Sequence, residues 1–197
     1  MEENKNCPCK KKSCPRHGSC SECRRYHAGF DRPRPVRCEK HISTRPFRPG
    51  DEKDVANVIR RTLEISNKDD YSPDFIRANI ESHSPDVVAA QTRDAHFYVV
   101  TDRKKIIGCG GITGYWGSTE ESYIMSVFVL PEYQGRGIGK RIVETLESDE
   151  YFTRARRTEV GSSITAVGFY RKMGYEFKNG ITTPDEYNVV RLEKRKP

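Results

Sequence analysis

The sequence predicts a mixed α/β fold, in which one sheet carries helices, preceded by a small cysteine-rich module that binds a metal. Segments with strand-like and helix-like patterns alternate through residues 43–197, as in domains that pack helices on a sheet. A glycine-rich turn joins a strand to a helix at residues 134–139. Most of the cysteines lie within residues 7–38, apart from the rest of the chain.

The composition allows one ordinary domain and a small appendage. The chain has 197 residues, of which 35% are hydrophobic, enough to bury one core. Prolines favour extended backbone between the two parts, at positions Pro33, Pro35, Pro46 and Pro49. We therefore expect a cysteine-rich basic module and linker in residues 1–42 and an α/β domain in residues 43–197.

The first 42 residues hold too few large apolar side chains for a hydrophobic core, so cross-links must stabilise any fold they have. Cys20 and Cys23 have the spacing that lets two thiolates bind one tetrahedral zinc ion. Because no secretion signal is visible, disulfides are the poorer explanation. We expect zinc or a similar metal bound by a set drawn from Cys7, Cys9, Cys14, Cys20, Cys23 and Cys38. His17 or His27 could replace a cysteine, and disulfides, an iron–sulfur cluster or free thiols are alternatives.

The positive charge is concentrated at the amino-terminal end. The formal net charge is +7, and residues 1–48 hold 13 Lys and Arg against 5 Asp and Glu. Such a segment attracts nucleic acid or an acidic partner without sequence specificity, although a solvated appendage explains it as well. No apolar run approaches the roughly 20 residues that cross a bilayer, so we expect a cytoplasmic protein with no membrane contact.

The first half of the domain is expected to form helices followed by a hairpin. Asp51 is placed to cap a helix whose apolar positions recur at three- and four-residue spacing, namely Val55, Val58, Ile59, Thr62 and Leu63. Ser72-Pro73 and Ser84-Pro85 each predict a helix start, because a capping residue precedes a proline in the first turn. Residues 96–100 and 106–110 flank a short polar turn, which predicts a hairpin.

The second half alternates strands with helices. Residues 123–130 form the next expected strand, and the glycine turn follows it. The helix after the turn places four apolar residues on one face, Ile138, Ile142, Val143 and Leu146. Residues 158–160 then predict a strand, residues 166–173 a final helix, and residues 175–177 and 188–192 short strands.

The turn Gln134-Gly135-Arg136-Gly137-Ile138-Gly139 carries the clearest chemical signal. Glycines at alternate positions leave backbone N–H groups unshielded, and the following helix adds the positive end of its dipole. This combination predicts a phosphate site. Two common nucleotide motifs are excluded, because Lys140 stands where Gly-x-Gly-x-x-Gly needs its last glycine and Gln134 where Gly-x-x-x-x-Gly-Lys needs its first.

Two segments together closely resemble the Gcn5-related N-acetyltransferase (GNAT) family. They are Pro131-Glu132-Tyr133-Gln134-Gly135-Arg136-Gly137-Ile138-Gly139-Lys140 and Ala166-Val167-Gly168-Phe169-Tyr170-Arg171-Lys172-Met173-Gly174-Tyr175. The resemblance covers roughly residues 43–197 and leaves out the cysteine-rich module. It implies a GNAT-type acyl-CoA N-acyltransferase fold. It also implies transfer of acetyl from acetyl-CoA to a primary amine of a small molecule or protein, by direct attack in a ternary complex.

The resemblance assigns a cofactor site as well. The strand before the turn would pair with the pantetheine arm, with the N–H of Val129 at the thioester oxygen. Tyr170 matches a tyrosine that protonates the departing thiolate, and a phenol with a pKa near 10 is protonated at neutral pH. Ser163 stands where the family often has an asparagine. The implied cofactor-binding residues are Val127, Phe128, Val129, Gln134, Gly135, Arg136, Gly137, Ile138, Gly139, Lys140, Ser163, Phe169 and Tyr170.

The general base is harder to assign. Many family members carry a glutamate on the strand before the turn, but Tyr123 and Met125 occupy the matching positions here. Glu121 is the expected catalytic candidate, with three alternatives, Glu120, His83 and His96.

The acceptor cleft is expected in the variable segments 64–92 and 112–121. Because no obvious base is present, a second interpretation is a non-catalytic acyl-CoA-binding module, docked on nucleic acid or protein through the basic cysteine-rich segment.

Overall fold

The computed structural model describes residues 7, 9–30, 36 and 41–196. The chain divides into two compact units, one of residues 1–43 with 101–104 and the other of residues 44–100 with 105–197. Cys38, one of the expected metal ligands, lies outside the described residues.

The amino-terminal unit contains one described helix, α1, over Cys20–Ala28. A turn precedes it, in which the N–H of His17 donates to the carbonyl of Cys14 at 2.8 Å. The Nε2 atom of His17 lies 3.1 Å from the carbonyl oxygen of Cys9. α1 buries none of its residues, as expected for a segment too poor in apolar side chains to form a core.

The larger unit is built around a mixed sheet with the strand order β1-β2-β3-β4-β5-β7-β6. β3 and β4 are antiparallel, β4 and β5 are parallel, and β7 is antiparallel to both β5 and β6. The mixed sheet confirms the predicted α/β class. The strands are β1 (Ile42–Pro46), β2 (His96–Asp102), β3 (Lys105–Gly114), β4 (Glu121–Val129), β5 (Arg157–Ser162), β6 (Glu176–Phe177) and β7 (Val190–Arg195).

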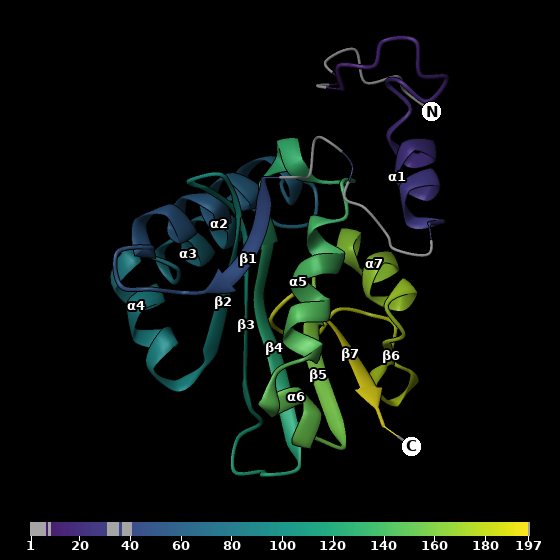
Figure 1. The fold of residues 1–197 in the computed structure, drawn as a ribbon. Helices are drawn as coiled ribbons and strands as arrows, with labels where there is room; N and C mark the ends of the chain where they lie inside the picture. Colours follow the sequence, from purple (N-terminus) through teal and green to yellow (C-terminus); the bar gives the residue numbers. More distant parts are fainter. Residues whose placement is uncertain (1–6, 8, 31–35, 37–40, 197) are drawn as a thin grey trace. The chain divides into compact units, whose positions relative to one another are not determined.

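Helices flank this sheet, with α2, α3 and α4 grouped to its left in Figure 1 and α5 and α6 in front of β4 and β5. The helices are α2 (Glu52–Ser66), α3 (Pro73–Glu81), α4 (Pro85–Asp94), α5 (Ile138–Glu147), α6 (Glu150–Arg154) and α7 (Val167–Lys172). Three short 3-10 segments connect them in the described chain, η2 (Pro131–Tyr133), η3 (Ile164–Ala166) and η4 (Lys178–Gly180).

The apolar faces predicted for α2 and α5 are confirmed. α2 buries Val55, Val58, Ile59, Thr62 and Leu63, and α5 buries Ile138, Ile142, Val143 and Leu146. The hydroxyl of Ser72 caps α3 by accepting from the N–H of Phe75 at 3.2 Å. α2 and α5 form because their apolar side chains recur on one face, and α3 begins at Ser72 because that residue caps its first turn.

Two local details differ from the expectation. Asp51 precedes α2, but its carboxylate makes no capping hydrogen bond, because it accepts from Arg45 at 2.6 and 2.9 Å and from the N–H of Arg48 at 2.8 Å. The stretch expected to be a proline-containing linker includes strand β1, which lies at the sheet edge and ends at Pro46. An edge position tolerates proline because a missing N–H there costs no ladder hydrogen bond.

A close approach between α5 and β3 sets the position of the glycine turn. A side chain at Gly110 of β3 would bring its Cβ to 2.5 Å from Cγ2 of Ile142 on α5. Only glycine lets the helix lie this near to the strand. The first turn of α5 is thereby held close to the sheet, beside the end of β4.

Candidate active site

β4 and β5 separate along their length and leave backbone groups without a strand partner. Pairing runs from Glu121 with Arg157 to Ile124 with Val160 and then stops. We call residues 121–124 with 157–160 the closed end, and residues 125–129 of β4 the open end. The N–H of Leu130 donates to the carbonyl of Ile107 on β3 at 2.9 Å. Since backbone groups alternate along a strand, the N–H groups of Val127 and Val129 face the gap.

A β-bulge lies where the pairing stops. Cys109 pairs with Phe128 and Gly111 pairs with Met125, so two residues of β4 oppose one residue of β3. Ser126, one of the two, has a φ of 52°. A bulge bends its strand and increases the local twist. The bend therefore carries the open end of β4 away from β5.

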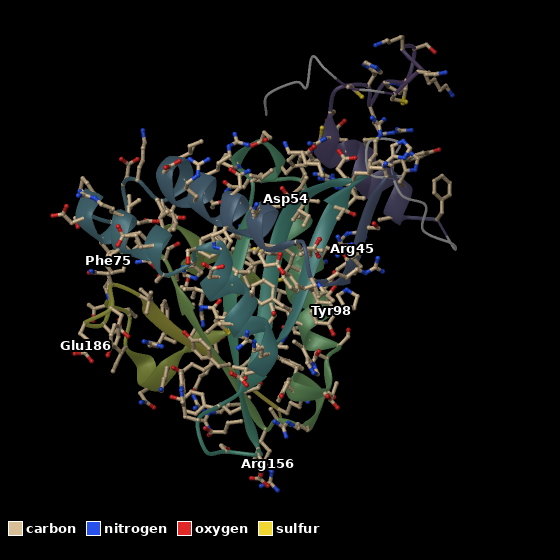
Figure 2. All side chains as sticks on the ribbon, turned by 90° about the vertical axis from the view of Figure 1, so that its left-hand side faces the viewer. Arg45, Asp54, Phe75, Tyr98, Arg156 and Glu186 are labelled. Carbon is tan, nitrogen blue, oxygen red and sulfur yellow. The ribbon has the colours of Figure 1, made fainter. Side chains whose placement is uncertain are left out.

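A buried ionic cluster holds the closed end. Arg157 binds Glu121 through two hydrogen bonds of 2.9 Å, and it reaches two further carboxylates, Glu159 at 2.6 Å and Glu193 at 3.2 Å. Hydrogen bonding from Arg157 lowers the pKa of Glu121. Burial acts to raise the pKa of Glu159, but Lys178 and Arg157 outweigh it and the pKa is lowered. Figure 2 shows the neighbouring Arg156 at the extreme lower end of the domain, which marks the closed end.

The glycine turn presents backbone N–H groups at the start of α5. Gly135 and Gly137 have φ values of 68° and 80°, and Gly137 is the left-handed residue that precedes the helix. The side-chain amide of Gln134 donates to the carbonyl of Val129 at 3.0 Å and to the hydroxyl of Ser66 at 2.9 Å. These bonds fix the turn against β4 and α2. The N–H groups at the start of α5 and the helix dipole then suit an anion.

A cavity of about 880 Å³ occupies the gap between the strands. Its walls come from β4, β5, the end of α2, the start of α5 and α7, and from four residues spaced four apart, Tyr71, Phe75, Asn79 and His83. Figure 2 shows Phe75 of α3 and Glu186 of the loop before β7 on the same side of the domain. The cavity is large enough for a pantetheine arm and an acceptor group.

Most of the expected cofactor-binding residues line this cavity. They are Val127, Phe128, Val129, Gln134, Gly135, Gly137, Gly139, Lys140, Ser163, Phe169 and Tyr170. Arg136 and Ile138 are not among the lining residues. The guanidinium of Arg136 lies 5.0 Å from the ring centre of Tyr133, and the side chain of Ile138 is buried in the core.

Tyr170 is the buried phenol of the cavity. It is 5% exposed and lines the gap, and its ring packs edge to face against Phe169 and Tyr175. Burial raises its pKa, and the nearby Tyr123 adds to the increase. The hydroxyl is therefore protonated at neutral pH and holds a hydrogen that it can donate in a hydrogen bond.

Glu121, the expected general base, does not line the cavity. Its carboxylate is held by Arg157 at the closed end, and its lowered pKa makes it a weak base. His96 lies elsewhere too, with Nδ1 2.9 Å from the carboxylate of Asp149. The structure instead brings His83 to the cavity wall. The four-residue spacing from Tyr71 to His83 is a helical periodicity that could have identified this wall from the sequence.

A pair of hydrogen bonds links the loop after α2 to the segment after β5. The carboxylate of Asp70 accepts from the hydroxyl of Thr165 at 2.7 Å and from its N–H at 3.2 Å. The next residue, Tyr71, lies in the cavity wall, where burial and Asp70 raise its pKa to about 12. These contacts hold together two segments that border the same cavity.

Several cysteines of the amino-terminal unit influence the pKa of Cys23. Among the residues described, no three His, Cys, Asp or Glu side chains are arranged to hold a metal ion. Burial raises the pKa of Cys23, and the charges of Cys7, Cys14, Cys9 and Cys20 raise it further. The thiols of these described cysteines thus lie near Cys23.

The described residues also contain no helix with the length and apolar character to span a membrane.

Comparisons with known proteins identify similar acetyltransferases. A family model described as an acetyltransferase (GNAT) domain matches residues 93–177. Peptidyl-lysine N-acetyltransferase YjaB of Salmonella typhimurium is 28% identical over 137 residues, which are 68% of this chain and 83% of that protein.

Solved structures share the fold. PaiA N-acetyltransferase of Thermoplasma acidophilum, in complex with coenzyme A, has a TM-score of 0.66 at 19% identity, over 79% of this chain and 99% of that one. A GCN5-related N-acetyltransferase of Rhodopseudomonas palustris has a TM-score of 0.64 at 22% identity, over 80% of this chain and 97% of that one.

Proposed function

We propose that this chain, which carries a GNAT acetyltransferase domain and is an acetyl-CoA-dependent N-acetyltransferase, acetylates a primary amine by direct attack within the cavity between β4 and β5. The observation that carries the proposal is the open end of β4 beside the glycine turn. The open end of β4 offers strand N–H groups that do not pair with β5, and the glycine turn offers N–H groups at the start of α5. Together they match an extended arm that ends in a pyrophosphate.

Different residues of the cavity then bind different parts of acetyl-CoA. The pyrophosphate lies on the N–H groups of residues 135–140, with Lys140 adding positive charge. The pantetheine arm runs along the open end of β4. The N–H groups of Val127 and Val129 bind the arm and the thioester oxygen, whereas the carbonyl of Val129 is already used by Thr62 and Gln134.

The chemical step needs stabilisation of one oxygen and protonation of one sulfur. When the amine attacks the thioester carbon, an oriented N–H at the developing oxyanion is worth about 2.7–4 kcal/mol. Collapse of the tetrahedral intermediate breaks the C–S bond, and Tyr170 donates its proton to the departing thiolate. Holding both reactants in one cavity supplies further rate by proximity.

The proposed acceptor is the side-chain amine of a protein lysine. Support comes from the likeness to YjaB, which is a peptidyl-lysine N-acetyltransferase and matches over 83% of its length. Thiol release from acetyl-CoA, measured with lysine peptides and with a panel of small amines, tests this assignment. Acetylation of small amines alone would refute the acceptor, and coenzyme A binding without turnover on any amine would refute the enzymatic proposal.

Tyr170→Phe tests the acid. We expect kcat to fall by about 10²–10⁴-fold, while coenzyme A affinity stays at the wild-type value, because the ring is retained. Tyr175→Phe is the matched control, since Tyr175 packs against Tyr170 with ring centres 5.7 Å apart but does not line the cavity. Full kcat in the Tyr170→Phe variant would remove this residue from the mechanism.

We also propose that the cysteines of residues 7–38 bind zinc or a similar metal. The clustering of cysteines around Cys23 supports this, because a bound cation would relieve the charge repulsion between their thiolate forms. Metal content of the full chain, purified under reducing conditions, tests the proposal. Protein without stoichiometric zinc or iron would rule it out. The acidic or nucleic-acid partner of this basic segment stays a prediction.

A further inference from the structure

The proposed reaction leaves open which group removes the proton from the acceptor amine. We propose that His83 is the general base, accepting this proton at Nε2 beside the β4 bulge. The inference rests on the proposed function, and it adds to that function the residue that takes the amine proton.

The residues around the cavity leave few candidates. Among the described residues that line it, none is Asp or Glu. Lys140 and Arg191 are cationic. Three lining tyrosines have a raised pKa, with burial the largest cause, namely Tyr71, Tyr123 and Tyr170. His83 is the lining imidazole in the described chain, and imidazole is the side chain that most readily accepts a proton near neutral pH.

Hydrogen bonding fixes which nitrogen of His83 is free to accept. Nδ1 lies 2.8 Å from the carbonyl oxygen of Asn79 and 3.2 Å from the hydroxyl of Ser82. A carbonyl only accepts, so Nδ1 carries the proton in the neutral ring. Nε2 is then an acceptor, and it lies 3.4 Å from the hydroxyl oxygen of Ser126.

The ring is also held in the neutral form. Burial lowers the pKa of His83, and the carbonyl of Asn79 opposes this effect in part. Among the described residues, no charged side chain is a cause of this change. The groups that face the ring from α3 and β4 are Asn79, Ser82, Ser126 and the ring of Phe128, whose centre is 6.0 Å away. None of them titrates near neutrality.

The position of Ser126 connects His83 to the reacting centre. Ser126 is the left-handed residue of the bulge and directly precedes Val127, whose N–H faces the gap. A second lining residue, Gln91, has a buried side-chain oxygen without a hydrogen-bond partner in the described chain. Such an oxygen suits an amine N–H. His83, Ser126 and Gln91 therefore all place polar acceptor atoms in the wall of this cavity.

Each bond and each proton that changes in the acetyl transfer can be assigned. The nitrogen lone pair forms the N–C bond, and the C=O electrons move to oxygen. Nε2 of His83 takes a proton from the amine nitrogen, directly or through the Ser126 hydroxyl. The oxyanion then re-forms the C=O bond as the C–S bond breaks, and the sulfur, which keeps the C–S electron pair, takes the Tyr170 proton. Exchange with solvent returns both side chains to their starting state.

The experiment compares the wild type with His83→Gln, His83→Ala and the control His96→Gln. His96 is a half-exposed histidine outside the cavity lining. We expect kcat for a lysine peptide to fall by about 10²–10⁴-fold in both His83 variants, with coenzyme A affinity unchanged. The His96 variant should keep the wild-type kcat.

Two readouts separate catalysis from structural support. The wild-type kcat should decrease as pH falls through a value below about 6.5, and this decrease should vanish in His83→Gln. Added imidazole should restore turnover to His83→Ala but not change the His96 variant. Retention of kcat or of the acid decrease in the His83 variants would overturn the proposal for His83 alone. A wild-type enzyme that acetylates no amine would instead overturn the proposed function.

Discussion

The two ends of the β4–β5 pair differ in what binds their polar groups. At the closed end, strand pairing and three carboxylates around Arg157 satisfy the polar groups within the protein. The hydroxyls of Ser122 and Thr158 add a buried hydrogen bond of 2.8 Å between the strands. At the open end, β4 turns its N–H groups toward a cavity of about 880 Å³.

The difference shows how a sheet can hold a gap between neighbouring strands without losing its order. The closed end fixes where both strands start, so the bulge at Ser126 needs only to redirect the last residues of β4. Changes at the closed end should therefore affect the free energy of unfolding. Changes at the open end should affect ligand affinity and turnover.

The largest expected effect is at Arg157. Replacement with Met would leave Glu121, Glu159 and Glu193 without their shared cation, and removing one partner of a buried ion pair costs about 3–5 kcal/mol. Chemical denaturation measures this loss. Arg156→Met is the control, because Arg156 is 80% exposed and 3.5 Å from Glu120, and such surface pairs are worth about 0–1 kcal/mol. Equal stability of the two variants would contradict the assigned role of the cluster.

The same cluster predicts loss of stability in acid. Glu121 and Glu159 have lowered pKa values in the folded protein. Their contribution is therefore fully present above the unfolded pKa of about 4.3 and is lost as pH falls through the lower folded values. Thermal unfolding across this pH range measures the slope. Arg157→Met should flatten it, and an unchanged slope in that variant would place the acid sensitivity elsewhere.

A smaller effect is expected at the glycine turn. Gly137→Ala places a side chain in the left-handed region, which costs about 1–2 kcal/mol, and it should weaken coenzyme A binding by displacing the N–H groups of the turn. Calorimetric titration with coenzyme A measures this. Gly168→Ala serves as the control, because that position has ordinary φ, open space around it and no contact with the cavity. Similar affinities in the two variants would exclude the turn as the phosphate site.

The smallest effect is expected at the link between Asp70 and Thr165. Thr165→Val removes an exposed hydroxyl that donates to Asp70 at 2.7 Å, and a hydrogen bond of this kind contributes about 0.5–1.5 kcal/mol. We expect little change in unfolding and a faster release of coenzyme A in stopped-flow experiments. A large loss of stability would show that this border of the open end is structural rather than a contact around the ligand.

Local patterns predicted the elements that depend on local chemistry. The apolar faces of α2 and α5 and the cap at Ser72 follow from the spacing of a few neighbouring residues. Features that depend on which side chains meet in the folded chain were not predictable in this way. Asp51 was expected to cap a helix, but Arg45 takes its carboxylate, and Glu121 was expected in the site, but Arg157 of the next strand holds it.

The candidate site also combines features that the local sequence predicts with features that only the folded chain produces. The turn at Gly135 to Gly139 could be predicted because its glycines are visible in the sequence and their spacing is local. The bulge at Ser126 has no equivalent sequence pattern, since serine is common in regular backbone and its φ of 52° depends on the strand beside it. His83 likewise lies in the cavity wall only because α3 packs near β4 in the folded chain.

The gap between β4 and β5 depends on the one extra residue in the bulge of β4. Between the pairs Met125 with Gly111 and Phe128 with Cys109, β4 has one residue more than β3. Deleting Ser126 would leave every flanking residue opposite its present neighbour on β3, while removing the bend that parts β4 from β5. A chain shorter by one residue should then extend its own strand pairing through the gap. One residue of β4 thus separates a sheet with a ligand gap from a sheet with continuous strand pairing.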